Sequence, residues 1–306
     1  MLKPFHLSII NRKSKFDLIL LLAAIIWGFA FVAQRVGMDY IGPFTFTAVR
    51  FTLGTLVLVP ILALWKRVPF RGVAPPSPER KRIILLQLLL GFLVFGGVSF
   101  QQYGIQFTTA GNAGFITGLY VIMVPVAGLF LGHKNHLSIW LGVIMALAGL
   151  YFLSVTADFR INPGDCFVLV CAFIWTAHVL IIGYVAPKTD PIRTAILQFA
   201  ICSVLSWLVA FFAEEIRIST ILMAAWPILY GGVFSVGIAY TLQVVAQQYA
   251  HPAYASIILS GESLFAALGG WIILSEPMTG RIILGCGLML AGMVVVQLRG
   301  MTSAQK

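Results

Sequence analysis

Charged residues are scarce in this sequence. They make up 10% of its 306 positions, whereas hydrophobic residues make up 60%. A soluble domain normally carries about 25% charged residues, so the chain lacks the polar surface that a globule presents to water. Uninterrupted apolar runs of about 18 residues or more are present instead, each long enough to cross a bilayer as a helix. The composition therefore excludes a soluble protein and predicts an all-α polytopic membrane protein.

Acidic residues are the scarcest charges. There are 10 Asp and Glu against 20 Lys and Arg, which gives a formal net charge of +10. Such an excess would suit a nucleic-acid partner if the basic residues formed one patch. They lie instead in the gaps between apolar runs, as in membrane loops that face an anionic leaflet. We expect the lipid bilayer, and no nucleic acid, to be the partner of these charges.

Motifs of several metal, cofactor and enzyme classes are also missing. His133 and His136 have a metal-compatible spacing but no acidic or cysteine partner. No GxxxxGK[ST] motif occurs, so we expect no ATP hydrolysis by the chain itself. The carboxylates and histidines form no concentrated set at a membrane face, so we expect no enzyme activity and no cofactor. The cysteines fall inside apolar runs without a CxxC pair, which predicts buried small side chains and no disulfide: Cys166, Cys171, Cys202 and Cys286.

Ten apolar segments of about 18–24 residues predict ten transmembrane helices. The segments are 17–34, 44–65, 82–104, 110–131, 137–154, 165–184, 192–212, 222–246, 253–274 and 280–298. The basic N-terminus before the first segment resembles a signal peptide. The run Leu18–Val32 is long, contains Trp27 and lacks a small-x-small cleavage site, so we interpret it as an uncleaved first span.

The basic residues predict the orientation of these spans. Arg50 lies within a span, and with a cytoplasmic N-terminus only four of the other Lys and Arg residues face outwards: Arg35, Arg160, Arg217 and Arg281. Basic residues concentrate in cytoplasmic loops of membrane proteins. We therefore predict that the N-terminal segment 1–16 and the tail 299–306 are both cytoplasmic.

The two halves of the chain, 17–154 and 165–298, resemble each other. A shift of 148 positions aligns Trp27 with Trp175, Pro43 with Pro191 and Arg50 with Gln198. A shift of 143 aligns Gly118 with Gly261, Gly142 with Gly285 and Gly149 with Gly292. Each half has five predicted helices, so the second copy enters the membrane upside down. Two inverted five-helix repeats are a transporter architecture, with the substrate site near the midplane between the repeats.

The sequence resembles the EamA-type permeases of the drug/metabolite transporter superfamily over about residues 17–298. Trp27, Trp175 and the pair Pro43 and Arg50 carry this resemblance, together with YGIQFTTAGNAGFITGLYVIMVP (103–125) and the parallel stretch 247–292. The resemblance implies a ten-helix bacterial inner-membrane transporter, often an exporter of amino acids or other small metabolites. It also implies that helices 1, 3, 4, 6, 8 and 9 surround a central cavity.

Polar and aromatic side chains inside the spans are the candidates for this cavity. Polar amides that face lipid are costly, so such side chains either line the cavity or join helices by hydrogen bonds. Two tryptophans lie about ten residues into their spans, deeper than an interfacial belt, and either line the cavity with nearby tyrosines or pack in the core. The polar candidates are Gln101, Asn112, Tyr240 and Gln243, and the aromatic candidates are Trp27, Trp175, Tyr120 and Tyr184.

Three ionisable residues within the spans have alternative interpretations. Arg50 could bind a substrate carboxylate, lock one state as an ion pair, or snorkel toward headgroups. His178 could relay protons or be a hydrogen-bonded structural residue. Glu262, near the bilayer centre, could bind a substrate ammonium, carry a proton, pair with Arg50 or His178, or act as a structural hydrogen bonder.

The leading functional hypothesis is a secondary transporter of small metabolites that works by alternating access. Protons are the candidate coupling ion, and uncoupled export is the alternative. A lipid flippase or a membrane sensor is a second hypothesis, and a membrane-embedded transferase is a third. The sequence does not indicate an oligomeric state.

Overall fold

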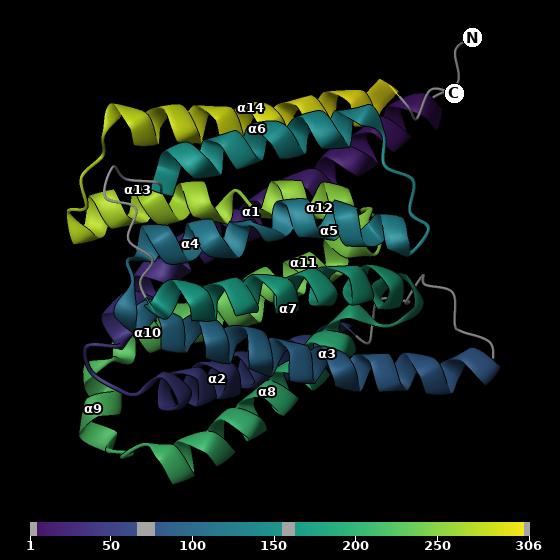
Figure 1. Cartoon of the computed structure of the whole chain (residues 1–306). Coiled ribbons are helices and arrows are strands. Elements are labelled where there is room, and N and C mark those ends of the chain that lie inside the picture. The colour runs from purple at the N-terminus through teal and green to yellow at the C-terminus, as the bar shows by residue number, and fades with distance from the viewer. Residues whose placement is uncertain (1–4, 66–76, 155–162, 303–306) are drawn as a thin grey trace.

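Helices make up the fold. The computed structural model describes residues 5–65, 77–154 and 163–302, and within these ranges all regular structure is helical and no strand occurs. The long helices lie side by side in one bundle (Figure 1). Helix α1 (Phe5–Gly37) begins, and α14 (Gly280–Thr302) ends, at the same end of this bundle. We call this the terminal end, and the end where α2 begins at Pro43 the distal end.

Eight helical stretches of the described chain are long and apolar enough to cross a membrane. They are α1; α2 (Pro43–Trp65); α3 (Ser77–Gly104) with η1 (Ile105–Phe107); α4 (Ala110–Gly118) with α5 (Tyr120–Phe130); α7 (Pro163–Val185) with η2 (Ala186–Lys188); α8 (Pro191–Ala213); α10 (Ala225–Leu229) through η3 (Tyr230–Tyr240) to α11 (Thr241–Gln247); and α12 (Pro252–Leu259) with α13 (Glu262–Leu274). Helix α6 (Leu137–Ser154) and α14 contain shorter apolar stretches, and the short α9 (Ile218–Met223) follows α8. The prediction of an all-helical membrane protein is confirmed, and the count of ten crossings stays a prediction.

Side chains satisfy the free backbone N–H groups where several helices begin, which lipid could not do. Thr109 accepts a hydrogen bond from the amide of Asn112, and Asp190 accepts one from the amide of Arg193. The Glu214 carboxylate accepts hydrogen bonds from the amides of Phe44 and Thr45, at 2.8 Å each. The last contact joins the end of α8 to the start of α2 across the distal end.

Two of the crossing helices are interrupted at equivalent points. Helix α4 ends at Gly118 before α5, and α12 ends at Leu259, so that Glu262 begins α13. Gly118 and Gly261 correspond under the shift of 143. A third crossing helix contains η3, an 11-residue stretch with π-helical geometry. Such stretches are rare in helices and frequently lie at functional sites.

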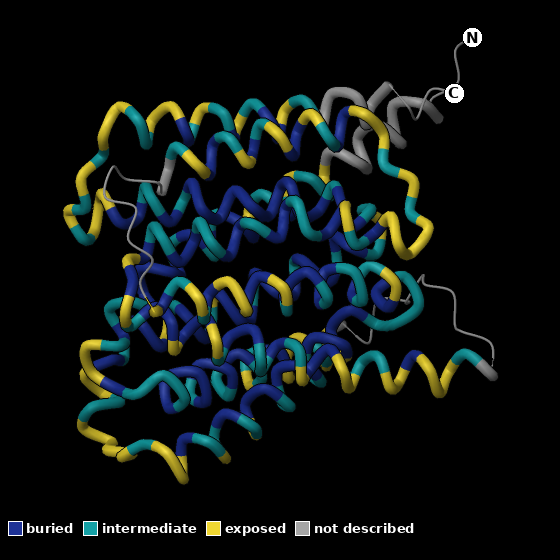
Figure 2. The backbone as a smooth tube through the Cα atoms, in the orientation of Figure 1, coloured by how far each residue is buried: buried dark blue, intermediate teal, exposed yellow. Residues whose placement is uncertain are grey.

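Burial distinguishes central from peripheral helices (Figure 2). An 18-residue stretch of Pro252–Leu274 is 67% buried and one of Ala225–Gln247 is 61% buried, against 33% for Pro43–Leu64. Large apolar side chains such as Phe211 and Phe212 cover the outside of the bundle. Helices α12, α13 and η3 therefore form the interior, together with α1.

The helix pairs have counterparts under exchange of the two halves. Helix α6 packs against α14, and α2 packs against α8. The packing of α3 on α7 corresponds to that of η3 on α1, and the packing of α13 on α1 corresponds to that of α5 on α7. This pattern is the one expected of a pseudo-twofold relation between the halves.

Glycines allow the close approach of α6 and α14. A Cβ atom at Gly149 would lie 2.6 Å from the carbonyl oxygen of Gly285, and one at Gly292 would lie 2.9 Å from that of Gly142. The backbones thus touch without side chains between them, as small residues permit in membrane helices.

Candidate functional site

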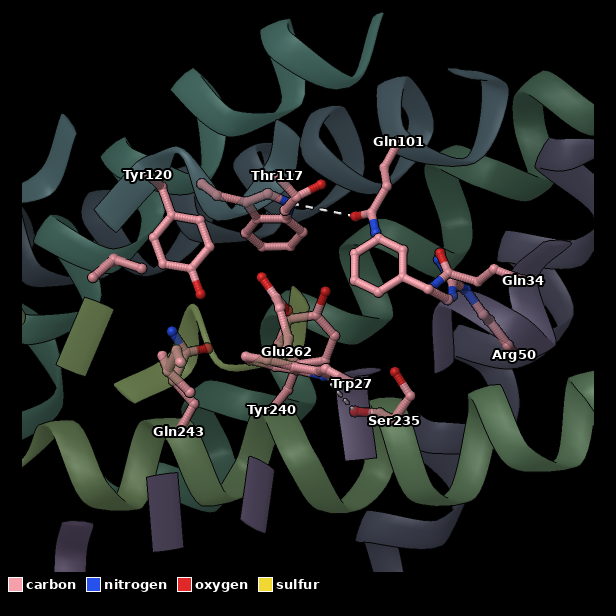
Figure 3. A pocket seen from close by; sticks show the side chains of 14 residues that line it. Trp27, Gln34, Arg50, Gln101, Thr117, Tyr120, Ser235, Tyr240, Gln243 and Glu262 are labelled. Carbon is pink, nitrogen blue, oxygen red and sulfur yellow. Dashed lines mark hydrogen bonds between the residues drawn. The ribbon is translucent and has the colours of Figure 1, made fainter. Parts of the chain in front are cut away.

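A cavity lies among the central helices. Its empty space is about 490 Å³, counted out to its open edge. Side chains converge on it from both halves of the chain (Figure 3). Its lining consists of Trp27, Phe31, Gln34, Arg50, Gln101, Thr117, Tyr120, Trp175, Val179, Ser235, Tyr240, Gln243, Leu259 and Glu262.

Aromatic rings form much of the wall. The Tyr240 ring centroid lies 4.6 Å from that of Trp27 and 5.7 Å from that of Trp175. The Trp27 indole donates to the backbone oxygen of Ser235 at 3.3 Å, and the Trp175 indole donates to the Oε1 atom of Gln101 at 3.4 Å. Both tryptophans are thereby oriented, with their polar edges satisfied inside the protein.

Glu262 is the acidic residue of the cavity. It is the first residue of α13 and is 5% exposed. Its carboxyl group interacts with the Tyr120 hydroxyl across the interface of the two halves. No basic side chain forms an ion pair with Glu262 among the residues that the structure describes. The alternatives that paired it with Arg50 or His178 are therefore not what this structure shows.

Arg50 is the basic residue of the cavity. It is 2% exposed, so it does not reach the lipid headgroups as a snorkelling arginine would. Its guanidinium carbon lies 5.2 Å from the ring centroid of Phe46 and 5.4 Å from that of Phe51. Its Nε atom has no hydrogen-bond partner.

Two amides of the lining also have an unsatisfied buried atom. The Oε1 atoms of Gln34 and Gln243 have no hydrogen-bond partner, although the Nε2 atom of Gln34 donates to the Ala30 carbonyl at 3.1 Å. Buried polar atoms are normally paired, and an unpaired one calls for an explanation, such as a water or ligand that it would bind. The cavity therefore offers acceptors at Gln34 and Gln243 and a donor at Arg50.

Most of the cavity residues predicted from the sequence lie together in this lining: Glu262, Trp27, Trp175, Tyr120, Gln101, Tyr240, Gln243 and Arg50. Asn112, near the start of α4, does not belong to it. His178 lies behind the wall, where its Nε2 atom is 3.0 Å from the Oε1 atom of Gln198 and its ring packs on Trp175. Tyr184 lies at the terminal end and donates to Glu79 at 2.7 Å.

Sequence reasoning did not identify Gln34, Thr117 or Ser235 as lining residues. Gln34 ends the first predicted span, and a polar amide at that place is the signal that could have found it. Thr117 lies in a glycine-rich stretch, and such stretches indicate close packing of helices rather than a cavity. Ser235 accepts from Trp27 through its backbone oxygen, so its side chain carried no signal.

Ionisable groups outside the spans lie at both ends of the bundle. At the terminal end, the ring centroids of His133 and His251 are 5.1 Å apart. Burial, together with the neighbouring His133, lowers the pKa of His251. At the distal end, burial raises the pKa of Glu276, and the nearby Arg35 opposes this shift. Within the described ranges, no three His, Cys, Asp or Glu side chains gather as a metal site would require.

Comparison with known proteins adds a family to this geometry. Residues 14–155 and 162–298 each match the EamA-like transporter family. An uncharacterized transporter of Archaeoglobus fulgidus is 32% identical over 92% of this chain and 86% of its own length. The uncharacterized transporter YoaV of Bacillus subtilis is 26% identical over 88% of this chain and 91% of its own. One solved crystal structure superposes with a TM-score of 0.75 at 20% identity and covers 93% of this chain and 99% of its own, a likeness that concerns the fold alone.

Proposed function

Because the chain belongs to the EamA-like transporter family and is a multi-pass membrane transporter, we propose that it carries small metabolites by alternating access. Amino acids or related compounds are the proposed cargo, and export is the proposed direction. The observation that carries this proposal is the cavity, which residues of both halves line at the centre of the bundle. A site between two halves can face either side of the membrane when the halves rock about it.

The proposed architecture is two inverted repeats, 17–154 and 165–298. The two family matches and the paired helix contacts support this division. The interruptions at Gly118 and Gly261 also support it, because they place a break of each half beside the cavity. Discontinuous membrane helices provide such breaks at the substrate sites of other transporters.

Glu262 is the proposed proton-coupling residue. It is the only carboxylate in the lining of this cavity, and its contact with Tyr120 ties it to the opposite half. A carboxyl group that gains and loses a proton can favour different arrangements of the halves. Substrate movement would then be linked to a proton gradient. His178 and Asn112 take no direct part in this proposal, since neither lines the cavity.

Uptake by proteoliposomes tests the proposal. Purified protein is reconstituted, loaded with unlabelled amino acids, and supplied with the radiolabelled compounds outside. Counterflow of label above that of protein-free vesicles is expected. Movement of labelled lipid without solute flux would indicate a flippase, chemical change of a substrate without flux would indicate a transferase, and binding without either would favour a sensor.

A further inference from the structure

The strongest unexplained feature of the cavity is the Arg50 guanidinium. The side chain is buried, lines the cavity, and has an Nε atom without a partner. Gly231 makes room for it, because a Cβ atom there would lie 3.3 Å from the Cδ atom of Arg50. The fold thus accommodates the side chain without satisfying its charge.

No carboxylate of the described chain pairs with Arg50. The ion pairs that the structure describes, Arg35–Asp39, Lys188–Glu79 and Arg217–Glu215, do not involve it. The carboxylate of Glu214, at the end of α8, lies against the start of α2, where it accepts hydrogen bonds from the amides of Phe44 and Thr45. The faces of two phenylalanine rings lie against the guanidinium, and Tyr240 and Cys202, neither of them a carboxylate, interact with it electrostatically.

An unpaired cation at this depth is costly. Insertion scales assign about 2.5–3.5 kcal/mol to an arginine at the centre of a membrane helix, and a buried charge without a partner destabilises a fold. A guanidinium presents a planar fork of donors that matches a carboxylate with two parallel hydrogen bonds. The missing partner is therefore an oxyanion that arrives with the ligand.

We propose that Arg50 is the anion-binding subsite of the cavity and that the solute is a small organic carboxylate with an apolar body. This inference rests on the proposed transport function. The lining holds one guanidinium, that of Arg50, and one carboxyl group, that of Glu262. This charge balance suits a solute with a single negative group rather than a multiply charged phosphate. The aromatic wall fits an apolar body, and the free Oε1 atoms of Gln34 and Gln243 accept hydrogen bonds from solute N–H or O–H groups.

Three matched compounds test the subsite on the purified full-length protein in detergent. 3-Phenylpropionate carries the carboxylate, 3-phenylpropanamide replaces it by a neutral amide, and 3-phenylpropylamine replaces it by a cation. Each is titrated while the thermal midpoint of unfolding is followed, since a ligand of the folded state raises that midpoint. The wild-type protein should bind the carboxylate most tightly.

Arg50→Gln should weaken binding of the carboxylate at least about tenfold and leave that of the amide unchanged, because a hydrogen bond to a charged group is worth that factor. Arg50→Lys keeps the charge but not the fork, so it should fall between the two. Arg217→Gln, an exposed arginine at the distal end, is the matched control and should behave as wild type. The ligand-free Arg50→Gln protein should unfold at the wild-type temperature or above, because it loses an unpaired charge.

The subsite is wrong if the wild-type protein binds carboxylate and amide equally, or if Arg50→Gln keeps the preference. Should Arg50→Gln not fold, undiminished carboxylate binding by Arg50→Lys overturns the proposal. Failure of the transport proposal looks different: wild-type vesicles then show no flux while the Arg50-dependent binding persists. Carboxylate flux by the wild-type protein that is unchanged in Arg50→Gln leaves the transporter standing and removes the subsite.

Discussion

At the scale of single residues, the cavity holds two opposite charges that do not neutralise each other. Glu262 interacts with Tyr120, whereas Arg50 lies between Phe46 and Phe51. Both are buried at the centre of a membrane bundle, where ionisable residues are costly and mark substrate or ion pathways. Their separation leaves each available to a solute or a proton.

Glu262→Gln isolates the proton-carrying role, because glutamine keeps the size and a hydrogen-bonding end but cannot ionise. We expect expression and folding to be retained, and proton-driven flux to fall about tenfold, a change of ~1.4 kcal/mol in the barrier. Flux at several pH values in proteoliposomes measures the effect. Glu215→Gln, an exposed glutamate, is the control. Wild-type flux of the Glu262→Gln protein at every pH tested would remove the role.

At the scale of elements, the contact of α6 and α14 depends on glycine. Gly149→Ala places a Cβ atom 2.6 Å from the carbonyl oxygen of Gly285, and backbone cannot yield as a side chain can. Overpacking of this kind costs about 1–3 kcal/mol. We expect a lower thermal midpoint of unfolding for this variant.

Gly287→Ala on α14 is the matched control for this substitution, because a Cβ atom there would meet nothing within 4 Å apart from the neighbouring backbone of its own helix. Alanine should leave the stability unchanged or raise it slightly, as it does inside helices generally. Equal destabilisation by the two substitutions would show that helix propensity or lipid contact, and not the contact of α6 and α14, decides the effect.

The start of α12 should respond to pH through His251. Its Nδ1 atom accepts from the Ala253 amide at 3.3 Å, and its lowered pKa comes from burial and from His133. Below the ordinary histidine pKa of about 6.5, the unfolded chain binds a proton that the folded protein still resists. The contribution of neutral His251 to the free energy of unfolding is therefore fully present above that pH. This contribution is lost as pH falls toward the lowered pKa.

His251→Asn tests this linkage, since asparagine also caps a helix but does not titrate. Between pH 8 and pH 5, the thermal midpoint of the variant should fall less than that of the wild type. His136→Asn, an exposed histidine of the same end, should follow the wild-type curve. Parallel curves for wild type and His251→Asn would assign the pH response to other groups.

The sequence predicted those elements whose signal is local. Apolar length identified the helices, whereas the glycines served only to align the two halves and did not show that α6 and α14 meet. The sequence named Arg50 as a cavity candidate but left a snorkelling position open, because α2 is apolar all round and lipid is as apolar as a protein core. It likewise gave no sign of the π-helical geometry of η3, which depends on the packing of its neighbours.

At the scale of the whole molecule, the arrangement of the halves decides which side each loop faces. Helices α1 and α14 place their outer ends together (Figure 1), as an even number of crossings requires. Because basic residues concentrate in cytoplasmic loops, we predict that the terminal end faces the cytoplasm and the distal end faces outwards. Lys134, in the turn after α5, and Glu215, after α8, then lie on opposite sides of the membrane.

Labelling of single cysteines in intact cells tests this orientation. Cys166 is exposed and Cys286 partly so, so the background is Cys166→Ser with Cys286→Ser. Glu215→Cys should react with a membrane-impermeant maleimide in intact cells, because its loop lies at the distal end. Lys134→Cys should react only after the membrane is opened. The reverse pattern would place the distal end in the cytoplasm. Labelling of both cysteines in intact cells would mean that the turn after α5 and the loop after α8 lie on one side of the membrane. The ten-crossing topology forbids that result.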